Sequence, residues 1–309
     1  MSSIPLEQLL SAGAHFGHLT RRWDPKMKEY IFMQKNGIHI IDLKKTQVCL
    51  DRALDVIRNV VSEGYEVLFV GTKVQAKEII ETEAKRCHQF YIAHRWLGGT
   101  LTNFTTIKKS IKHYKNLVKM STDGTYEKIS KKERLMIERE KEKLYAILSG
   151  IEEMKRLPGI VFIVDTKKEH IAVNEARKMN IPIVAMADTN ADPTIIDYPI
   201  PANDDAAKSI SLITGKIAEV IIEARQKVKE SRALDEAVQA EKAELQKEKD
   251  AEIIQKTLRK KGQAEKTTKA TAKISRAPIK DTPEEEKEAK PKAMDQVDYD
   301  NEYGNEKEF

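Results

Sequence analysis

A lysine-rich segment carries the clearest chemical signal in this sequence. Residues 104–119 contain five basic residues and no acidic one: Lys108, Lys109, Lys112, Lys115 and Lys119. In a helix, four of them recur every three or four residues and form one stripe: Lys108, Lys112, Lys115 and Lys119. Such a stripe neutralises successive phosphates of a nucleic-acid backbone without reading its bases. The alternative is the solvated face of an ordinary lysine-rich helix, although no glutamate is present to balance the charge.

A second basic segment lies near the N-terminus and combines cations with an aromatic residue. Its members are Arg21, Arg22, Trp23, Lys26 and Lys28. A proline in the middle of the segment and the adjacent charges predict an irregular, exposed loop. Cations beside an aromatic ring suit contacts with RNA phosphates and unstacked bases. We therefore predict a second RNA contact here.

A third candidate contact lies within residues 94–103. Arg95 and Trp96 stand directly before the flexible pair Gly98-Gly99, close to the start of the lysine-rich segment. We expect Arg95 to reach a phosphate. Trp96 fits two roles, stacking on RNA or packing in the core.

Carboxylates follow two predicted strands and form the one candidate metal site. Asp188 ends a strand, and Asp204 and Asp205 follow the next one. If these strands are neighbours, the carboxylates gather at one edge of the sheet, where His18 could join them as a ligand for zinc or magnesium. Alternatively, Asn203, Asp204 and Asp205 cap the following helix. An EF-hand calcium loop is excluded, because Pro193 stands where that loop requires glycine.

The sequence lacks the fingerprints of cofactor-dependent enzymes. It contains neither G-x-G-x-x-G nor G-x-x-x-x-G-K-[ST]. Gly71, Thr72 and Lys73 mark a strand-to-helix junction that either holds an RNA phosphate or is a plain turn capped by the threonine. His15 and His18 flank a glycine, and we expect hydrogen-bonded structural roles for them. We predict no catalysis, no small-molecule substrate and no required cofactor, with a zinc or magnesium ion as the only exception.

Short apolar runs that alternate with helical patterns must position these residues. The expected strands are Ile38–Ile41, Glu66–Gly71, Phe90–Ala93, Gly159–Asp165, Ile181–Asp188 and Tyr198–Ile200. Helices are expected over about residues 46–62, 73–87 and 168–179, and another begins near residue 203. Near-continuous apolar strands separated by helices are typical of a parallel sheet covered on both faces. We therefore predict a doubly wound, Rossmann-like α/β fold.

Two segments depart from this alternation. Residues 104–156 contain two helical stretches, about 104–120 and 130–155, around an Asp-Gly turn, and they predict an inserted helical hairpin. Beyond about residue 225 the chain becomes rich in charge and poor in large apolar residues. The expected parts are an N-terminal basic arm with the first strand (1–45), an α/β domain (46–103 and 157–225), the hairpin (104–156), a charged helical extension (226–262) and a disordered tail (263–309).

Positive charge is concentrated in two of these parts, although the net charge of the 309 residues is only +5. Residues 105–157 hold 14 basic and 8 acidic residues, whereas residues 226–309 hold 19 and 20. Basic appendages on a nearly neutral body suit a polyanionic partner. Two cysteines without a C-x-x-C pattern and the lack of a long apolar run predict a cytoplasmic protein with no membrane partner.

Taken together and in order, these segments closely resemble the bacterial family of ribosomal protein S-two, of the small subunit. The matching motifs are Leu9–His18, Arg22–Lys28, Asn36–Asp42, Leu68–Lys73, His94–Asn103, Leu157–Gly159 and Asp188–Pro193. The resemblance covers about residues 4–225. It implies a flavodoxin-like domain with an inserted helical hairpin and no catalytic activity. The long extension after about residue 226 is a departure, because many relatives lack it.

The same resemblance implies the partners. It implies binding to 16S ribosomal RNA between the head and body of the subunit, contacts with neighbouring small-subunit ribosomal proteins, and a role in holding the large mRNA-binding protein S-one. We therefore expect a ribosome-bound protein whose arm, Arg95 and hairpin lysines contact phosphates. Two competing functions are a nucleotide- or metal-dependent enzyme and a coiled-coil scaffold. They require a phosphate fingerprint or a heptad seam, and the sequence contains neither.

Overall fold

The computed structural model describes residues 4–123, 129–231, 238–239 and 242. The chain forms two compact units, Met1–Val238 and Gln239–Phe309, and the strands and long helices of the described residues lie in the first. Most of the extension expected over residues 226–262, and all of the tail expected over 263–309, lie outside the described residues.

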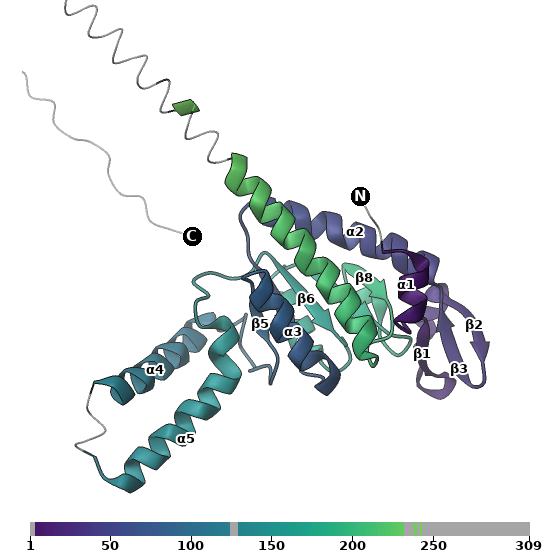
Figure 1. The fold of residues 1–309 in the computed structure, drawn as a ribbon. Helices are drawn as coiled ribbons and strands as arrows, with labels where there is room; N and C mark the ends of the chain where they lie inside the picture. The colour runs from purple at the N-terminus through teal and green to yellow at the C-terminus, as the bar shows by residue number, and fades with distance from the viewer. Residues whose placement is uncertain (1–3, 124–128, 232–237, 240–241, 243–309) are drawn as a thin grey trace, which may run out of the picture. The chain divides into compact units, whose positions relative to one another are not determined.

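A five-stranded parallel sheet forms the centre of the first unit (Figure 1). Its strands are β4 (Val67–Val70), β5 (Phe90–Ile92), β6 (Ile160–Val164), β7 (Ile183–Ala187) and β8 (Tyr198–Pro201). They lie side by side in the order β5-β4-β6-β7-β8. This is the strand order of a flavodoxin-like, doubly wound sheet. The predicted fold class is therefore confirmed.

Both faces of this sheet are buried, because every residue of β4, β6 and β7 is apolar and inaccessible to solvent. Alternate side chains point to opposite faces, so Val67 and Phe69 enter one core while Leu68 and Val70 enter the other. Helices α2 (Leu43–Ser62) and α3 (Val74–Arg86) and a helix over residues 207–231 cover the first face. Helix α6 (His170–Lys178) and the base of the hairpin cover the second.

The N-terminal arm contains two strands that were not predicted, one on each side of the basic segment 21–28. Strands β1 (Phe16–Leu19), β2 (Ile31–Lys35) and β3 (Ile38–Ile41) form a separate antiparallel sheet in the order β1-β3-β2. Asn36 and Gly37 have positive φ angles of 50° and 73°, as the tight turn between β2 and β3 requires. The predicted strand at 38–41 is confirmed, but it does not join the parallel sheet. Between β1 and β2 the chain forms two short 3-10 helices over Thr20–Arg22 and Pro25–Tyr30.

The inserted hairpin projects from the body, as expected (Figure 1). It consists of α4 (Phe104–Thr122) and α5 (Lys131–Leu148). Ser130 and Glu133 begin α5 with a reciprocal capping box. Helix α5 ends before the expected residue 155, because the chain tightens into a 3-10 turn over Ser149–Ile151 that packs beside β5.

Helix starts also differ slightly from the sequence-based prediction. Helix α2 begins at Leu43 because the Asp42 carboxylate accepts a hydrogen bond from the Lys44 backbone N–H. The last described helix begins at residue 207 and not near 203. Among the described residues, no helix is both long and apolar enough to span a membrane.

Candidate nucleic-acid interface

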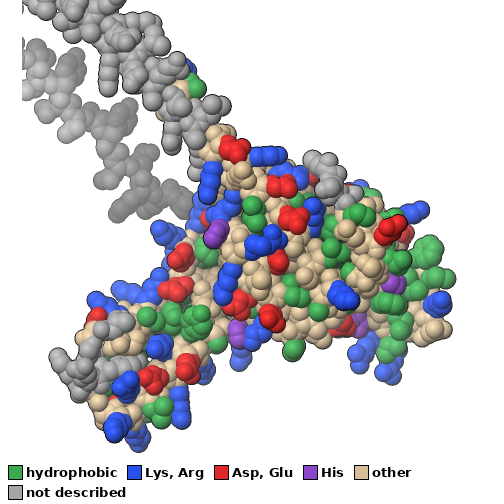
Figure 2. Space-filling model, in the orientation of Figure 1, with side chains coloured by type: hydrophobic (Ala, Val, Ile, Leu, Met, Phe, Trp, Pro, Cys, Tyr) green, Lys and Arg blue, Asp and Glu red, His purple; other side chains and the backbone are tan. Residues whose placement is uncertain are grey.

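The five hairpin lysines all lie exposed on α4. Ile107, Ile111, Tyr114 and Leu117 occupy the opposite, buried side of the same helix. The apolar residues recur at helical spacing, so the lysines are turned outward. Figure 2 shows blue side chains along the projecting hairpin. The helix therefore exposes these cations to solvent.

Acidic residues from other segments lie near part of this stripe. Lys115 Nζ lies 3.5 Å from Glu152 Oε1, and Lys119 Nζ lies 3.9 Å from Asp123 Oδ2. Lys108 Nζ donates to the Lys155 backbone carbonyl at 2.7 Å. Residues 104–119 contain no acidic residue, but the fold brings Glu152 and Asp123 close to two of the lysines. These pairs are exposed, and contacts of this kind contribute only about 0–1 kcal/mol, which phosphates displace readily.

The arm presents some of its cations and pairs another internally. Arg21, Arg22 and Lys28 are exposed, whereas Lys26 Nζ forms a 2.5 Å ion pair with Asp192. That hydrogen bond to Asp192 raises the pKa of Lys26. The half-buried ring of Trp23 lies 4.9 Å from the ring of His39, measured between centroids. Lys26 therefore joins the arm to the loop after β7, while its neighbours remain available to a partner.

Arg95 and Trp96 have opposite environments. Arg95 is exposed, as a phosphate contact requires. Trp96 is only 7% exposed, packs in the core beneath the sheet, and donates its indole N–H to Glu175 Oε1 at 3.0 Å. The core role is therefore the observed one. This corrects the assignment of Trp96 to the RNA-binding residues, because a buried ring that is already hydrogen-bonded cannot stack on a base.

Lys73 lies at the carboxyl edge of the parallel sheet among carboxylates. Its Nζ atom lies 2.7 Å from both Asp204 Oδ1 and Asp205 Oδ1 and 3.1 Å from Asp165 Oδ2. Burial lowers the pKa of Lys73, but the charge and hydrogen bond of Asp204 outweigh this effect and raise it. The ammonium is thus neutralised internally. This corrects the expected contact between Lys73 and an RNA phosphate, because three carboxylates surround the cation.

Thr72 does not cap α3 either, which corrects the other interpretation of this junction. Its hydroxyl and backbone N–H both donate to Glu169 Oε1, and the residue at the helix cap is Lys73, without a side-chain cap bond. Gly71 lies close to Ile80 and Ala76, so that a Cβ there would be 3.0–3.3 Å from their side chains. The junction is a packed structural turn.

His18 reaches the same acidic edge from β1. Its Nδ1 atom lies 2.9 Å from Asp188 Oδ2, and its Nε2 atom lies 3.4 Å from Asp205 Oδ2. One ligand atom from each of His18, Asp188 and Asp204 falls within 4.8 Å of the others. The structure therefore brings together the candidate metal ligands, which lie far apart in sequence. The capping interpretation is not observed, because the helix begins at residue 207, whereas Asn203 Oδ1 accepts from the backbone N–H groups of Asp205 and residue 206 and so closes a turn before it.

The donor set at this edge suits a cation. Burial, together with the charges of Asp188 and Asp165, raises the pKa of Asp204 to about 7. The hydrogen bond to Asp188 raises the pKa of His18. Negative charge thus exceeds what Lys73 can neutralise. An imidazole nitrogen with two carboxylates resembles a zinc site more closely than the all-oxygen shell of magnesium.

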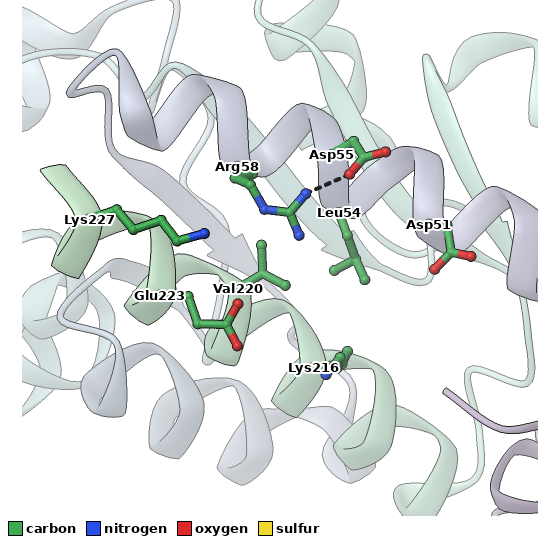
Figure 3. Close-up of a pocket in the computed structure, with 8 residues that line it drawn as sticks. All are labelled: Asp51, Leu54, Asp55, Arg58, Lys216, Val220, Glu223 and Lys227. Atoms are coloured by element: carbon green, nitrogen blue, oxygen red, sulfur yellow. Dashed lines mark hydrogen bonds and ion pairs between the residues drawn. The ribbon is translucent and has the colours of Figure 1, made fainter. Parts of the chain in front are cut away.

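The same edge does not suit the anionic cofactors that flavodoxin-like sheets usually bind there. Asp165, Asp188, Asp204 and Asp205 would repel a phosphate. A separate pocket of about 300 Å³ lies between α2 and the helix over 207–231 (Figure 3). Its walls alternate acidic and basic residues, and Asp55 and Arg58 already pair at 2.6 Å.

Comparison with known proteins identifies the family to which this chain is similar. A family model described as Ribosomal protein S2 matches residues 9–224. The small ribosomal subunit protein uS2 of Chloroherpeton thalassium is 59% identical over 224 residues, which cover 72% of this chain and 90% of the relative. The protein of that name from Cytophaga hutchinsonii is 53% identical over 243 residues, 78% of this chain and 96% of the relative.

The chain belongs to the ribosomal protein S2 family. This is a family of structural proteins of the small ribosomal subunit and not of enzymes. The resemblance seen in the sequence motifs is therefore confirmed. The family match ends at residue 224, so the charged extension lies outside it.

An exposed apolar surface on the small sheet escaped the sequence analysis. Phe32 is 69% exposed, and Phe16, Leu19 and Met33 are exposed around it. Figure 2 shows green side chains gathered at the right of the view, where Figure 1 labels the small sheet. The sequence signal for this surface was the pair of adjacent apolar residues Phe32 and Met33, because neighbouring residues of a strand point to opposite faces and cannot both enter one core. Asp165 was also missed, although it follows a buried strand just as Asp188 does.

Proposed function

We propose that the protein is a constituent of the small ribosomal subunit that binds 16S ribosomal RNA through backbone phosphates. The observation that carries this proposal is the exposed lysine stripe on the projecting helix α4. Arg21, Arg22, Lys28 and Arg95 provide further exposed cations. Such contacts supply affinity and orientation without reading bases. The proposed location is the bacterial cytoplasm, on the ribosome.

The stripe is tested by reversing its charge. Replacing Lys108, Lys109, Lys112 and Lys115 with glutamate should leave the fold intact, because all four side chains are exposed. Each lost phosphate contact lowers the slope of log affinity against log salt by about 0.9 for duplex-like RNA. We therefore expect weaker co-sedimentation with small subunits and a flatter salt dependence.

A matched control reverses four exposed lysines elsewhere in the chain: Lys178, Lys208, Lys227 and Lys229. This variant has the same net charge but keeps the stripe, so its co-sedimentation should remain close to that of the wild type. If the hairpin variant sediments with the small subunit as well as the wild type across the salt series, the stripe is not an RNA anchor.

We also propose that the exposed apolar surface on β1 and β2 contacts a neighbouring small-subunit protein, including the large mRNA-binding protein S-one. An exposed group of large apolar side chains on a soluble domain usually marks a protein contact. Phe32 and Met33 form the outermost part of the surface. RNA phosphates are poor partners for it, because these side chains offer neither charge nor hydrogen bonds.

We also propose that His18, Asp188 and Asp204 bind a zinc ion at the carboxyl edge of the parallel sheet. Its support is the convergence of one imidazole and two carboxylates from three separate segments. Such an ion would neutralise negative charge at a site where burial, together with the charges of Asp188 and Asp165, raises the pKa of Asp204 to about 7. Its role would be structural, since it would tie β1 to the ends of β7 and β8.

A further inference from the structure

One buried carboxylate lies beneath the loop from which the hairpin departs. Glu175 is in the middle of α6 and only 7% exposed. Its Oε1 atom accepts hydrogen bonds from the Trp96 indole at 3.0 Å and the Gly99 backbone N–H at 2.8 Å. Its Oε2 atom accepts from the Leu101 and Thr102 backbone N–H groups at 3.0 and 3.2 Å, and from the Thr102 hydroxyl at 3.2 Å.

All five of these partners are donors, so the site requires a group that only accepts. An ionised carboxylate offers about four lone-pair positions and no proton. Burial raises the pKa of Glu175, but the bonds from Trp96, Leu101, Gly99 and Thr102 outweigh burial and lower it. The charged form is therefore the one that the loop stabilises. A glutamine would direct two amide protons toward groups that already donate.

The loop held in this way leads directly into the lysine-bearing helix. Thr102 is bonded twice to Glu175, and α4 begins two residues later at Phe104. Gly99, with a φ of +87°, turns the chain between the bonded residues. Leu101 fills the core between them with 1% exposure. Glu175 thus fixes the loop directly before α4 to the body at several points.

We propose that Glu175 is a positioning residue that sets the direction of the hairpin and so aligns its lysines with ribosomal RNA. The inference rests on the proposed RNA-binding function of α4. It assigns no RNA contact to Glu175 itself. It also explains the burial of Trp96, whose indole belongs to the same clamp.

The direction of the hairpin can be measured in the free protein, without RNA. Nitroxide labels at Asn116→Cys on α4 and Glu63→Cys on the body, both exposed positions, report the distance between the two parts. Cys49 is replaced by serine, and Cys87 is buried. We expect a narrow distance distribution for wild type and a broadened or displaced one for Glu175→Gln. An unchanged distribution would overturn the clamp.

Glu169→Gln is the matched control. Glu169 is also a buried carboxylate and lies just before α6, but it accepts hydrogen bonds from Thr72 and not from the hairpin loop. It should lower stability in a comparable way yet leave the label distance unchanged. If Glu175→Gln does not fold, Trp96→Phe removes one donor of the clamp and Glu175→Asp shortens the acceptor. Either milder variant should broaden the distribution, and the absence of broadening in both would contradict the proposal.

The consequence for RNA is tested on the full chain with 16S ribosomal RNA. Glu175→Gln should weaken binding roughly tenfold, because a preorganised surface becomes mobile. Combined with the four-lysine reversal, it should cause little further loss, since both act through α4. A displaced hairpin with unchanged RNA affinity, or fully additive losses, would overturn the positioning role. If the lysine reversal alone has no effect, the proposed RNA anchor fails while the label distances still test the clamp.

Discussion

At the scale of single residues, the carboxyl edge of the sheet shows how one cation is shared among several carboxylates. Lys73 contacts Asp165, Asp204 and Asp205, while His18 contacts Asp188. The pKa of Lys73 rises because it gains several partners, and the pKa of Asp204 rises because one partner cannot offset burial and two nearby charges. The two shifts describe the same excess of negative charge. A divalent cation, or a proton, is the natural complement.

This arrangement predicts metal retention that depends on pH. Protons compete with zinc for His18 and Asp204, whose pKa values are raised, that of Asp204 to about 7. In equilibrium dialysis the wild-type chain should therefore retain zinc well at about pH 8 and poorly at about pH 5, on either side of these values. Asp188→Ala should abolish retention at both pH values.

Lys208→Ala is a suitable control, because this exposed lysine follows the cluster without belonging to it. It should retain zinc like the wild type. Equal retention by Asp188→Ala and wild type at high pH would end the metal hypothesis. Parallel dialysis with magnesium checks whether the histidine selects zinc over an oxygen-preferring ion.

At the scale of elements, the hairpin is attached to the body at two roots. The first is the loop before α4, held by Glu175. The second is the 3-10 turn Ser149–Ile151 after α5, which packs beside β5. Gly150 makes this second approach possible, because a Cβ there would collide with the Tyr91 backbone carbonyl and ring. Edge strand β5 is thereby covered, which protects it from pairing with other chains.

Gly150→Ala should therefore destabilise the protein. The added methyl group forces the turn away from β5, and overpacking of this kind costs about 1–3 kcal/mol. Thermal unfolding followed by circular dichroism would show the loss as a lower Tm. Gly98→Ala is the control, since a Cβ at Gly98 meets nothing within 4 Å, and its effect should stay within about 0.5 kcal/mol. Equal Tm values for the two variants would contradict the close-approach argument.

At the scale of the whole described unit, the lysine stripe and the exposed apolar group around Phe32 lie on different elements. The basic stripe is on the hairpin, whereas the exposed apolar group is on the small antiparallel sheet (Figure 2). The parallel sheet between them, with its two buried cores, holds the surfaces apart.

The apolar surface makes a prediction that separates it from the RNA stripe. Replacing Phe32 and Met33 with serine should weaken capture of the large mRNA-binding protein S-one by small subunits, while incorporation of the chain itself remains normal. Fluorescence or immunoblot quantification of S-one on purified subunits measures this. Val74→Ser is the control, because Val74 is 85% exposed on a different element. Unchanged S-one occupancy in the double variant would show that the surface serves another purpose.

The sequence by itself determined the features that depend on local pattern. Apolar runs of four or five residues specified the parallel strands, and lysine spacing specified an outward stripe on α4. Ordered motifs specified the family. The sequence also indicated that Asp188 and Asp204 meet, with His18 beside them, on the condition that their two strands are neighbours, because the carboxyl ends of neighbouring parallel strands share one edge.

Only the tertiary structure decided which partner each polar side chain has. The pairing of Lys73 with carboxylates up to 132 positions away, and the burial of Trp96 on Glu175, depend on contacts between distant segments. A glutamate in a helix pattern gives no sign that five donors will surround it. Likewise, β1 and β2 carry exposed apolar residues, and only the fold shows that both pair with β3, β2 across a tight turn and β1 without one. Local periodicity encodes burial, whereas hydrogen-bond and ion-pair partners depend on which elements fold side by side.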